Sequence, residues 1–168
     1  MRSGSERTMI DLVPMGEDDF KKYLKEAIPK YAKEKVESGS WKEEQSLELS
    51  SREFNRNLPD GIATKGHYLF NLQDKDTRRN VGMIWVELRN PDSVESGSWI
   101  WDFIVNENER GRGFGKDALI SLDRFLGRMG QNKVSLHVFG HNEIAINLYK
   151  KSGYSVTDLV MSKDIKVR

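Results

Sequence analysis

The sequence predicts a single domain of the mixed α/β class, with about four helices flanking one sheet of six to seven strands. Segments in which apolar residues recur at helical spacing are interleaved with segments that alternate with period two or are rich in β-branched and aromatic residues. The chain has 168 residues, which is the size of one domain, and no repeat or low-complexity linker divides it. The expected order of elements is β-α-α-β-β-β-α-β-α-β-β.

The chain begins with a segment that carries no structural pattern. Residues 1–8 are polar, so we expect a cloning-derived or disordered leader, and the domain is expected to span residues 9–165. Apolar residues at 9–13 predict a short first strand that ends at Pro14.

Two helices follow. The first begins in the acidic turn at Glu17, and Pro29 is expected to kink or restart it because proline has no amide donor. The second lies between Trp41 and Leu58 and is stopped by the turn sequence that begins at Pro59. Its apolar side is expected to carry Leu47, Phe54 and Leu58.

Three strands come next. Residues 68–72 and 81–88 are separated by 74–80, which has the composition of a hairpin loop. Residues 89–97 form a further turn region. Residues 99–105 are apolar almost throughout, which indicates a central strand covered on both faces.

The C-terminal third again alternates helix and strand. Residues 118–129 form an amphipathic helix closed by Gly130, and residues 134–138 alternate as a strand. A short helix then runs from an N-cap at Asn142 to a left-handed residue at Gly153. Two final short strands are expected at residues 154–156 and 158–161.

The composition excludes several classes of protein. No stretch approaches the ~20 consecutive apolar residues of a membrane helix, so we expect no membrane partner. The 27 basic and 26 acidic residues leave a net charge of +1, which removes the electrostatic basis for a general nucleic-acid or membrane-surface binder. With no cysteine, the chain has no disulfide, thiolate metal site or cysteine nucleophile. A cytoplasmic location is expected, because no apolar signal segment is present.

The most informative segment lies between residues 105 and 118, where a buried strand leads into the amphipathic helix. Three glycines at alternate positions lack Cβ atoms, so that successive backbone amides can face one concavity. The helix dipole and three basic side chains add positive potential, a combination that suits a phosphate or pyrophosphate. The segment reads Arg110, Gly111, Arg112, Gly113, Phe114, Gly115 and Lys116.

Two familiar phosphate motifs do not fit these residues. A P-loop would need glycine where Arg110 stands and a hydroxyl where Asp117 stands, and the dinucleotide fingerprint needs another glycine spacing. The other interpretation of the segment is a tight strand–helix connection with a solvated basic face.

The pattern Arg110-x-x-Gly113-x-Gly115 resembles the acetyl-CoA pyrophosphate loop of the GNAT acyltransferase superfamily. After the next strand, Asn142-x-x-Ala145-x-x-Leu148-Tyr149-x-x-x-Gly153-Tyr154 resembles the second motif of that superfamily. The order of elements over residues 9–165 is also similar. Three further stretches resemble the bacterial YycN-type group within it: Tyr31–Val36, Ser135–Phe139 and Val160–Lys163.

The resemblance implies an N-acetyltransferase that uses acetyl-CoA as co-substrate and no metal, built on a mostly antiparallel sheet that splays at the cofactor site. It implies that the pantetheine arm binds the strand backbone and that the pyrophosphate binds the amides of residues 110–116. It also implies that Asn142 and Ala145 touch the cofactor and that Tyr149 faces the thioester sulfur. The strand residues in question are Phe103, Ile104 and Val105.

Acyl transfer to an amine needs a neutral amine, support for the oxyanion and a proton for the leaving thiolate. Because the chain has no cysteine, direct attack in a ternary complex is the simple route. Tyr149 suits the role of acid, since a phenol with an ordinary pKa of about 10 stays protonated at pH 7. The alternative for Tyr149 is packing in the last turn of a helix.

The general base is open at this stage. Asp102 is the only carboxylate inside the apolar strand, and burial should raise its pKa, but a structural aspartate fits equally well. Some members of the superfamily carry a glutamate earlier on this strand, where this chain has Trp99. We expect Glu107 and Glu109 to stay solvated, and a water chain is a further alternative.

The histidines and the arginine–glycine stretch carry weaker signals. His137 and His141 have the spacing of a helical metal pair but fall on a strand and its turn, where that spacing separates the rings. Residues 110–115 resemble RNA-binding Arg/Gly segments, but one copy in a neutral chain is weak evidence. We therefore expect neither a metal nor a nucleic-acid partner.

The expected partners are acetyl-CoA and an amine acceptor, a small amine or a protein or peptide amine, bound by a monomer or homodimer. The acceptor is expected to contact residues 30–44 and the chain near Thr157. The competing class is a non-catalytic acyl-CoA-binding sensor or interaction module on the same fold, because a fold does not guarantee its chemistry.

Overall fold

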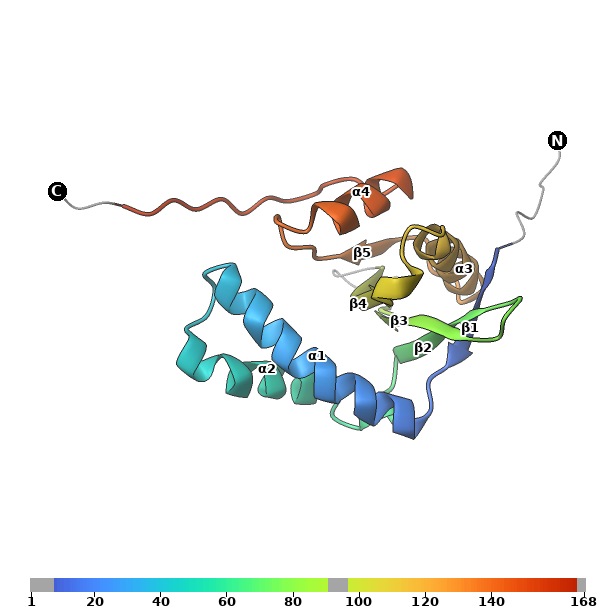
Figure 1. The fold of residues 1–168 in the computed structure, drawn as a ribbon, viewed down its shortest axis with the longest axis horizontal. Coiled ribbons are helices and arrows are strands. Elements are labelled where there is room, and N and C mark those ends of the chain that lie inside the picture. The colour runs from blue at the N-terminus through green and yellow to red at the C-terminus, as the bar shows by residue number, and fades with distance from the viewer. Residues whose placement is uncertain (1–7, 91–96, 166–168) are drawn as a thin grey trace.

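The computed structural model describes residues 8–90 and 97–165 of the chain (Figure 1). Within them lie four α-helices and one five-stranded sheet. Residues 1–7 of the expected leader and 91–96 of the expected turn region lie outside the described residues. The elements are β1 (Ile10–Pro14), α1 (Glu17–Glu37), α2 (Glu43–Asn57), β2 (His67–Asp74), β3 (Asn80–Glu87), β4 (Ser98–Val105), α3 (Phe114–Arg128), β5 (Val134–Leu136) and α4 (Glu143–Lys151).

The strands follow chain order in space, from β1 to β5. Neighbouring strands from β1 to β4 pair antiparallel, and β5 pairs parallel to β4. The mixed α/β fold with four helices and a mostly antiparallel sheet is thus confirmed. None of the described helices has the length and the apolar character needed to cross a membrane.

Helices cover the sheet on both faces (Figure 1). Alternate residues of β3 point to opposite sides: Met83 and Trp85 pack with α1 and α2, whereas Ile84 and Val86 pack with α3. This strand is buried almost throughout because it carries apolar residues on both faces. The two cores therefore meet the central strands from opposite sides.

The C-terminal strands are a correction. Residues 154–165 contain no strand, and beyond α4 they extend away from the rest of the chain (Figure 1). The sheet of the described chain accordingly has five strands, not the six or seven expected. Alternating apolar residues indicate strand propensity, but a strand also needs a neighbour for its backbone hydrogen bonds, and this segment pairs with no described strand.

Two details of the helical layer also differ from expectation. The first helix continues through Pro29 to Glu37 rather than restarting. On α2, Leu47 is 57% exposed, and the small Ser50 takes the buried position and donates to the Ile28 carbonyl at 2.7 Å. Small residues at this contact let α1 and α2 approach closely, which hydrophobic spacing alone did not predict.

Thr8, which was expected in the leader, packs against the described domain. Thr8 is buried, its carbonyl accepts from Lys75 Nζ at 2.8 Å, and its hydroxyl accepts from Ser121 at 3.1 Å. These contacts tie the start of β1 to α3 and to the hairpin that joins β2 and β3.

Candidate active site

The glycine-rich segment forms the N-terminus of α3. Gly113 is the N-cap residue, with a left-handed φ of 86° that side chains with a Cβ rarely adopt. The first helical bond runs from the Asp117 amide to the Gly113 carbonyl at 3.1 Å. The amides of residues 114–116 lie ahead of that bond, which is where a helix offers donors to an anion.

Gly115 of the glycine-rich segment lies against Leu148 of the motif that begins at Asn142. A Cβ at this position would lie 3.0 Å from Cδ2 of Leu148 on α4. The missing side chain therefore lets α4 pack directly over the first turn of α3.

The basic side chains of the loop mostly hold its shape. Arg110 Nε donates to the Val105 carbonyl at 3.0 Å, and Arg112 forms an ion pair with Glu109. Glu109 is only 5% exposed and also pairs with Arg79 at 3.1 Å, so the expectation that it stays solvated was wrong. A buried carboxylate needs such partners, because burial without them is costly. Lys116 is exposed.

The strand before the loop has an open edge. β5 pairs with β4 only from Ser98 to Ile100, so no described strand pairs with residues 101–105 on that side. On the other side, residues 102–105 remain paired with β3. The sheet therefore opens between β4 and β5, and the open edge leads to the N-terminus of α3.

A bulge in β4 places two neighbouring side chains on the same face. The register with β3 shifts between Trp85 and Val86, where Trp101 is the extra residue. Trp101 stacks on Trp85 with centroids 5.5 Å apart, and Asp102 points toward α1. Without the bulge, strict alternation would send one of these side chains to the opposite face.

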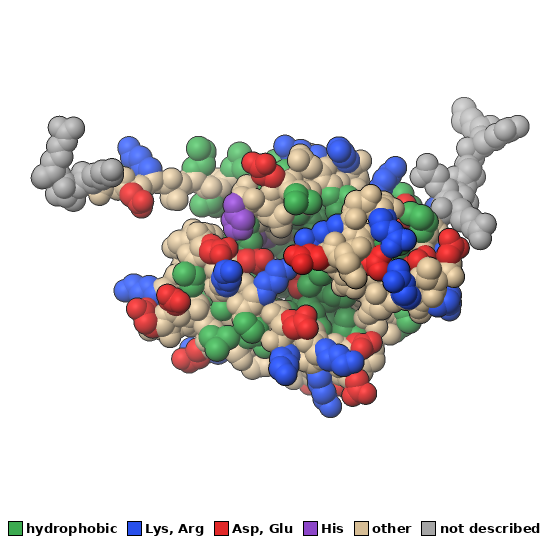
Figure 2. Space-filling view, viewed as in Figure 1, with side chains coloured by type: hydrophobic (Ala, Val, Ile, Leu, Met, Phe, Trp, Pro, Cys, Tyr) green, Lys and Arg blue, Asp and Glu red, His purple; other side chains and the backbone are tan. Residues whose placement is uncertain are grey.

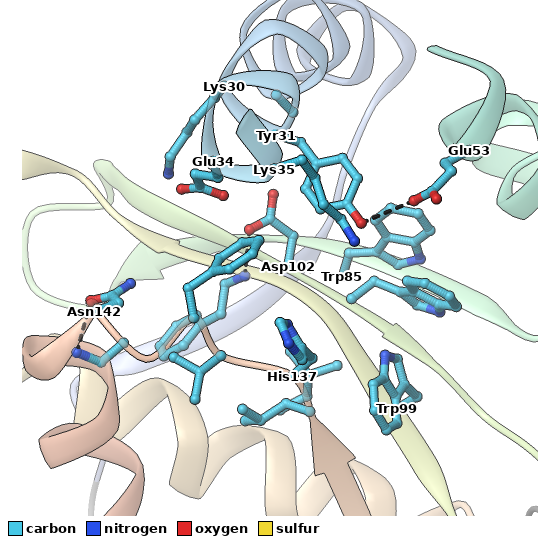
Figure 3. Close-up of a pocket in the computed structure, with 18 of the residues that line it drawn as sticks. Lys30, Tyr31, Glu34, Lys35, Glu53, Trp85, Trp99, Asp102, His137 and Asn142 are labelled. Atoms are coloured by element: carbon cyan, nitrogen blue, oxygen red, sulfur yellow. Dashed lines mark hydrogen bonds between the residues drawn. The ribbon is translucent and has the colours of Figure 1, made fainter. Parts of the chain in front are cut away.

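A cavity of about 280 Å³ opens between α1 and α4 at the place where the sheet opens. Figure 2 shows the surface hollowed between these two parts of the molecule, with charged side chains of both signs at the rim. The lining includes Lys30, Tyr31, Glu34 and Lys35 of α1, Asp102 and Phe103 of β4, and Asn142, Ala145 and Tyr149 at α4 (Figure 3). The fold thus brings Asp102, Tyr149 and Asn142 to one cavity.

Asp102 is held by two hydrogen bonds. Tyr23 Oη donates to Oδ2 at 2.8 Å, and the Phe103 amide donates to Oδ1 at 2.9 Å. Burial raises the pKa of Asp102, although the bond from Tyr23 and the charge of Lys30 act in the opposite direction. Asp102 is therefore a carboxylate with increased basicity at the edge of the cavity.

Tyr149 lies on α4 with its ring 6.3 Å from Phe103 and 5.5 Å from Tyr154, measured between centroids. Burial, with a smaller contribution from the charge of Asp102, raises the pKa of Tyr149 to about 12. The phenol is therefore protonated throughout the physiological range. Its helix begins at Asn142, whose side chain accepts from the Ala145 amide at 3.2 Å, as the predicted N-cap requires.

Sequence reasoning expected residues 30–44 to contact the acceptor, but it did not single out the polar residues of α1 at the site. Tyr23 bonds Asp102 without lining the cavity, whereas Tyr31 lines it, and its hydroxyl donates to Glu53 at 2.9 Å while burial raises its pKa. Burial also raises the pKa of Glu34. The available signal was helical spacing: Tyr23, Tyr31 and Glu34 lie on one face of α1, among its apolar core residues.

The histidines of the late segment do not form a pair. Phe139 lies between them, with its ring 5.1 Å from His137 and 5.6 Å from His141. Across residues 8–90 and 97–165, no three acidic or histidine side chains gather as they would around a metal ion.

The fold is that of the GNAT acetyltransferases. The model of the Acetyltransferase (GNAT) family matches residues 28–154, and the chain belongs to this family. It is 40% identical over 158 residues to the uncharacterized N-acetyltransferase YycN of Bacillus subtilis (strain 168), which covers 93% of this chain and 99% of that protein. It is 31% identical to the uncharacterized N-acetyltransferase YdgE of the same organism, over 92% of this chain and 97% of that one.

Solved structures agree with this assignment. The crystal structure of YycN superposes with a TM-score of 0.87 at 39% identity, covering 94% of this chain and 99% of that chain. The aminoglycoside 6'-N-acetyltransferase AAC(6')-Ih of Acinetobacter baumannii shares the fold, with a TM-score of 0.56 at 13% identity over 94% of this chain and 99% of that one.

Proposed function

We propose that this chain is an acetyl-CoA-dependent N-acetyltransferase that transfers the acetyl group directly to an amine in a ternary complex. The observation that carries the proposal is the meeting of Asp102 and Tyr149 at one cavity, beside the open edge of β4. A protonated phenol and a buried carboxylate at one cavity suit a reaction in which an amine loses a proton and a leaving thiolate gains one.

The cofactor site fits acetyl-CoA by its donor set. The left-handed Gly113 turns the backbone so that the amides of residues 114–116 face outward, and these would hold a pyrophosphate. The edge of β4 at Phe103, Ile104 and Val105, where no described strand pairs on the β5 side, would bind the pantetheine arm as a neighbouring strand does. Asn142 and Ala145 would border that arm. Acetyl-CoA supplies the thioester carbonyl that the amine attacks.

Tyr149 would supply the proton for the departing sulfur. Complete transfer from a phenol of pKa about 12 to a thiolate with an ordinary pKa near 8.5 is uphill by roughly 5 kcal/mol. Tyr149 therefore acts first as a hydrogen-bond donor at Oη. Transfer then follows because the same burial that weakens the phenol as an acid makes the sulfur more basic, and the Tyr149 oxygen regains a proton from the nitrogen, which loses one as the amide forms.

The role of Asp102 depends on the acceptor. At pH 7 a lysine amine of pKa ≈ 10.4 is neutral in about one molecule in 2,500, which costs roughly 4.6 kcal/mol, whereas an α-amine costs only about 1.0–1.4 kcal/mol. A lysine acceptor thus needs a committed base, and an α-amine does not. Because Tyr23 and Phe103 already bond both oxygens of Asp102, we propose an acceptor amine of low pKa.

The side of the cavity formed by α1, α2 and the start of β4 would receive that acceptor. Glu34 of α1 and Glu53 of α2 place carboxylates there, beside Lys30 and Lys35, and Tyr31, Trp99 and Trp101 provide aromatic surface. This combination suits an amine next to an apolar or ring-shaped group, since carboxylates attract the protonated amine and aromatic rings bury the remainder.

A panel of amines tests the proposal. The chain is incubated with acetyl-CoA and α-amine, small-amine or lysine acceptors, and released thiol is measured together with acetylated product by mass spectrometry. We expect thiol and product in equal amounts with at least one α-amine or other low-pKa amine. Tight CoA binding without thiol release from any amine would instead indicate the acyl-CoA-binding sensor.

A further inference from the structure

One side of the cavity carries an aromatic platform, which consists of Trp85 on β3 and Trp101 on β4. The two indole rings are stacked, with an interplanar angle of 25° and centroids 5.5 Å apart. Trp85 is only 2% exposed, whereas Trp101 is 37% exposed, and both line the cavity. Tryptophan side chains are highly buried on average, so an indole this exposed at a candidate active site offers its surface to a ligand.

Two residues that face each other across the β2–β3 pair hold these rings by their N–H groups. His67 and Glu87 are register partners. Trp85 Nε1 donates to His67 Nδ1 at 2.9 Å, and Trp101 Nε1 donates to Glu87 Oε2 at 3.0 Å. Burial lowers the pKa of His67, which keeps its imidazole neutral and Nδ1 an acceptor. Because an indole has a single donor, the platform presents only apolar ring surface to the cavity.

The platform is also braced from the side. Trp99 meets Trp101 edge to face at 6.3 Å between centroids, and the guanidinium of Arg89 lies 5.3 Å from the centre of the Trp99 ring. Arg89 in turn pairs with Glu87 at 3.2 Å. In Figure 3, Trp85 and Trp99 lie together at one side of the cavity, away from Asn142. These contacts fix the rings before any ligand binds.

The bulge in β4 sets where the platform lies relative to the reaction. It turns Trp101 to the same face as the neighbouring Asp102. A pantetheine arm along residues 103–105, with its pyrophosphate at the N-terminus of α3, would point its thioester end toward Asp102. The next side chain on this face is that of Trp101. The group attached to the acceptor's amino nitrogen would therefore meet the platform.

A fixed, flat and apolar surface favours a ligand that is itself flat and rigid. A ring loses little conformational freedom when it stacks on such a surface, whereas a flexible chain must give up several rotamers. An aromatic ring and the apolar face of a saturated, hydroxylated ring both offer a surface of this kind.

We propose that Trp101 determines acceptor specificity and selects amines that carry a ring next to the amino group. This inference rests on the proposed function, because it takes the amine to bind at this side of the cavity. His67 and Glu87 contact only the indole rings, so they are positioning residues that keep the platform in place.

Binding of paired amines to the CoA complex tests the platform without requiring turnover. Phenylalanine amide and leucine amide are both α-amines but differ in the ring, and glucosamine differs from its open-chain alditol in the same way. Calorimetric titration of the CoA-saturated native chain measures each affinity. We expect the ring-bearing member of at least one pair to bind about three- to tenfold more tightly, as an aromatic stacking contact allows.

Four variants assign this preference to the platform. Trp101→Leu keeps an apolar side chain without a flat face and should abolish the preference, whereas Trp101→Phe keeps a ring and should retain part of it. Glu87→Ala releases the indole N–H of Trp101 and should reduce the preference. Glu87→Gln should restore it, because the amide oxygen still accepts that bond. Calorimetric titration with CoA shows that each variant is folded.

Equal affinities within both pairs, or a ring preference that survives Trp101→Leu, would overturn the role of Trp101. These results differ from a failure of the proposed function. Ring-selective binding without acetylation of any amine would leave the platform in place and remove the transfer activity. Acetylation of amines without any ring preference would keep the activity and remove the platform.

Discussion

The framework of this molecule, residues 8–90 and 97–128, differs sharply from its C-terminal region, residues 134–165. In the framework, Leu72, Ile84 and Leu122 are completely buried, and apolar layers cover both faces of the sheet. In the C-terminal region no described residue is fully buried, although β5, α4 and residues 154–165 are all rich in apolar side chains. The framework is complete as a single chain, whereas the C-terminal region has apolar surface still to be covered.

The candidate active site lies where these two regions meet. Asp102 is fixed by Tyr23 within the framework, whereas Tyr149 belongs to the half-buried α4. Because loosely packed elements open at a lower free-energy cost than buried ones, we expect the α4 side of the site to yield more readily to a cofactor and an acceptor. The two proposed catalytic groups therefore lie in regions of different packing: Asp102 in the densely packed framework and Tyr149 in the loosely packed C-terminal region.

The largest effect is expected from a substitution of Tyr149, the proposed acid on α4. Tyr149→Phe should lower kcat by about 10²- to 10⁴-fold, the range typical of a general acid, while CoA affinity changes little. Steady-state kinetics and calorimetric titration with CoA measure the two quantities. An unchanged kcat with chemistry rate-limiting would remove Tyr149 from the mechanism.

A matched pair of truncations tests the packing difference itself. Leu122→Ala in the framework should lower the free energy of unfolding by about 2–5 kcal/mol, because it leaves a cavity in a closed core. Ile144→Ala on α4, where the side chain is 78% exposed, should change it by no more than about 0.5 kcal/mol. Urea unfolding measures both, and equal losses would contradict the division into two regions.

The cofactor loop should lose CoA affinity beyond any cost of the substitution to stability. Gly113→Asp adds a Cβ at a left-handed φ and a negative charge at the N-terminus of α3. CoA binding should weaken by more than the ~0.3–1 kcal/mol of a surface dipole contact, because strain and charge repulsion add to it. Calorimetric titration of the folded variant with CoA measures this affinity. An affinity equal to that of the native chain would mean that the pyrophosphate binds elsewhere.

The smallest effect is expected from a substitution of Asp102 in the framework. Because the proposed acceptor has a low pKa, Asp102→Asn should reduce kcat/KM less than tenfold, and kcat/KM should rise with pH along the ionisation of each amine used. A loss of several orders of magnitude, with one pH profile for every amine, would make Asp102 the base. In that case Tyr23→Phe should move the profile to higher pH, since the Tyr23 bond lowers the pKa of Asp102.

Local patterns of the sequence predicted the framework and the loop well. The helical spacing of α3, the glycines before it and the N-cap at Asn142 depend on neighbours only a few residues away, so they can be read directly. The contact between Tyr23 and Asp102 joins residues 79 positions apart, and the bulge at Trp101 breaks the period-two pattern. Neither has a local signal.

Residues 154–165 failed to match their prediction for a different reason. Their alternating side chains do favour a strand, but a strand forms only beside another strand, and the sequence does not say where that strand lies. The burial of Glu109 was missed in a similar way, because its partner Arg79 comes from the hairpin between β2 and β3. In both cases the local structure depends on a partner that is distant in sequence, which a local pattern does not reveal.

The most direct test of the proposed mechanism is a rapid-quench experiment on the native chain with acetyl-CoA, analysed by intact-mass spectrometry. Direct transfer predicts an unmodified chain with acetyl-CoA alone and, after addition of an accepted amine, one acetylated amine for each thiol released. An acetylated chain that forms before the amine is added and decays as product appears would contradict direct transfer in a ternary complex.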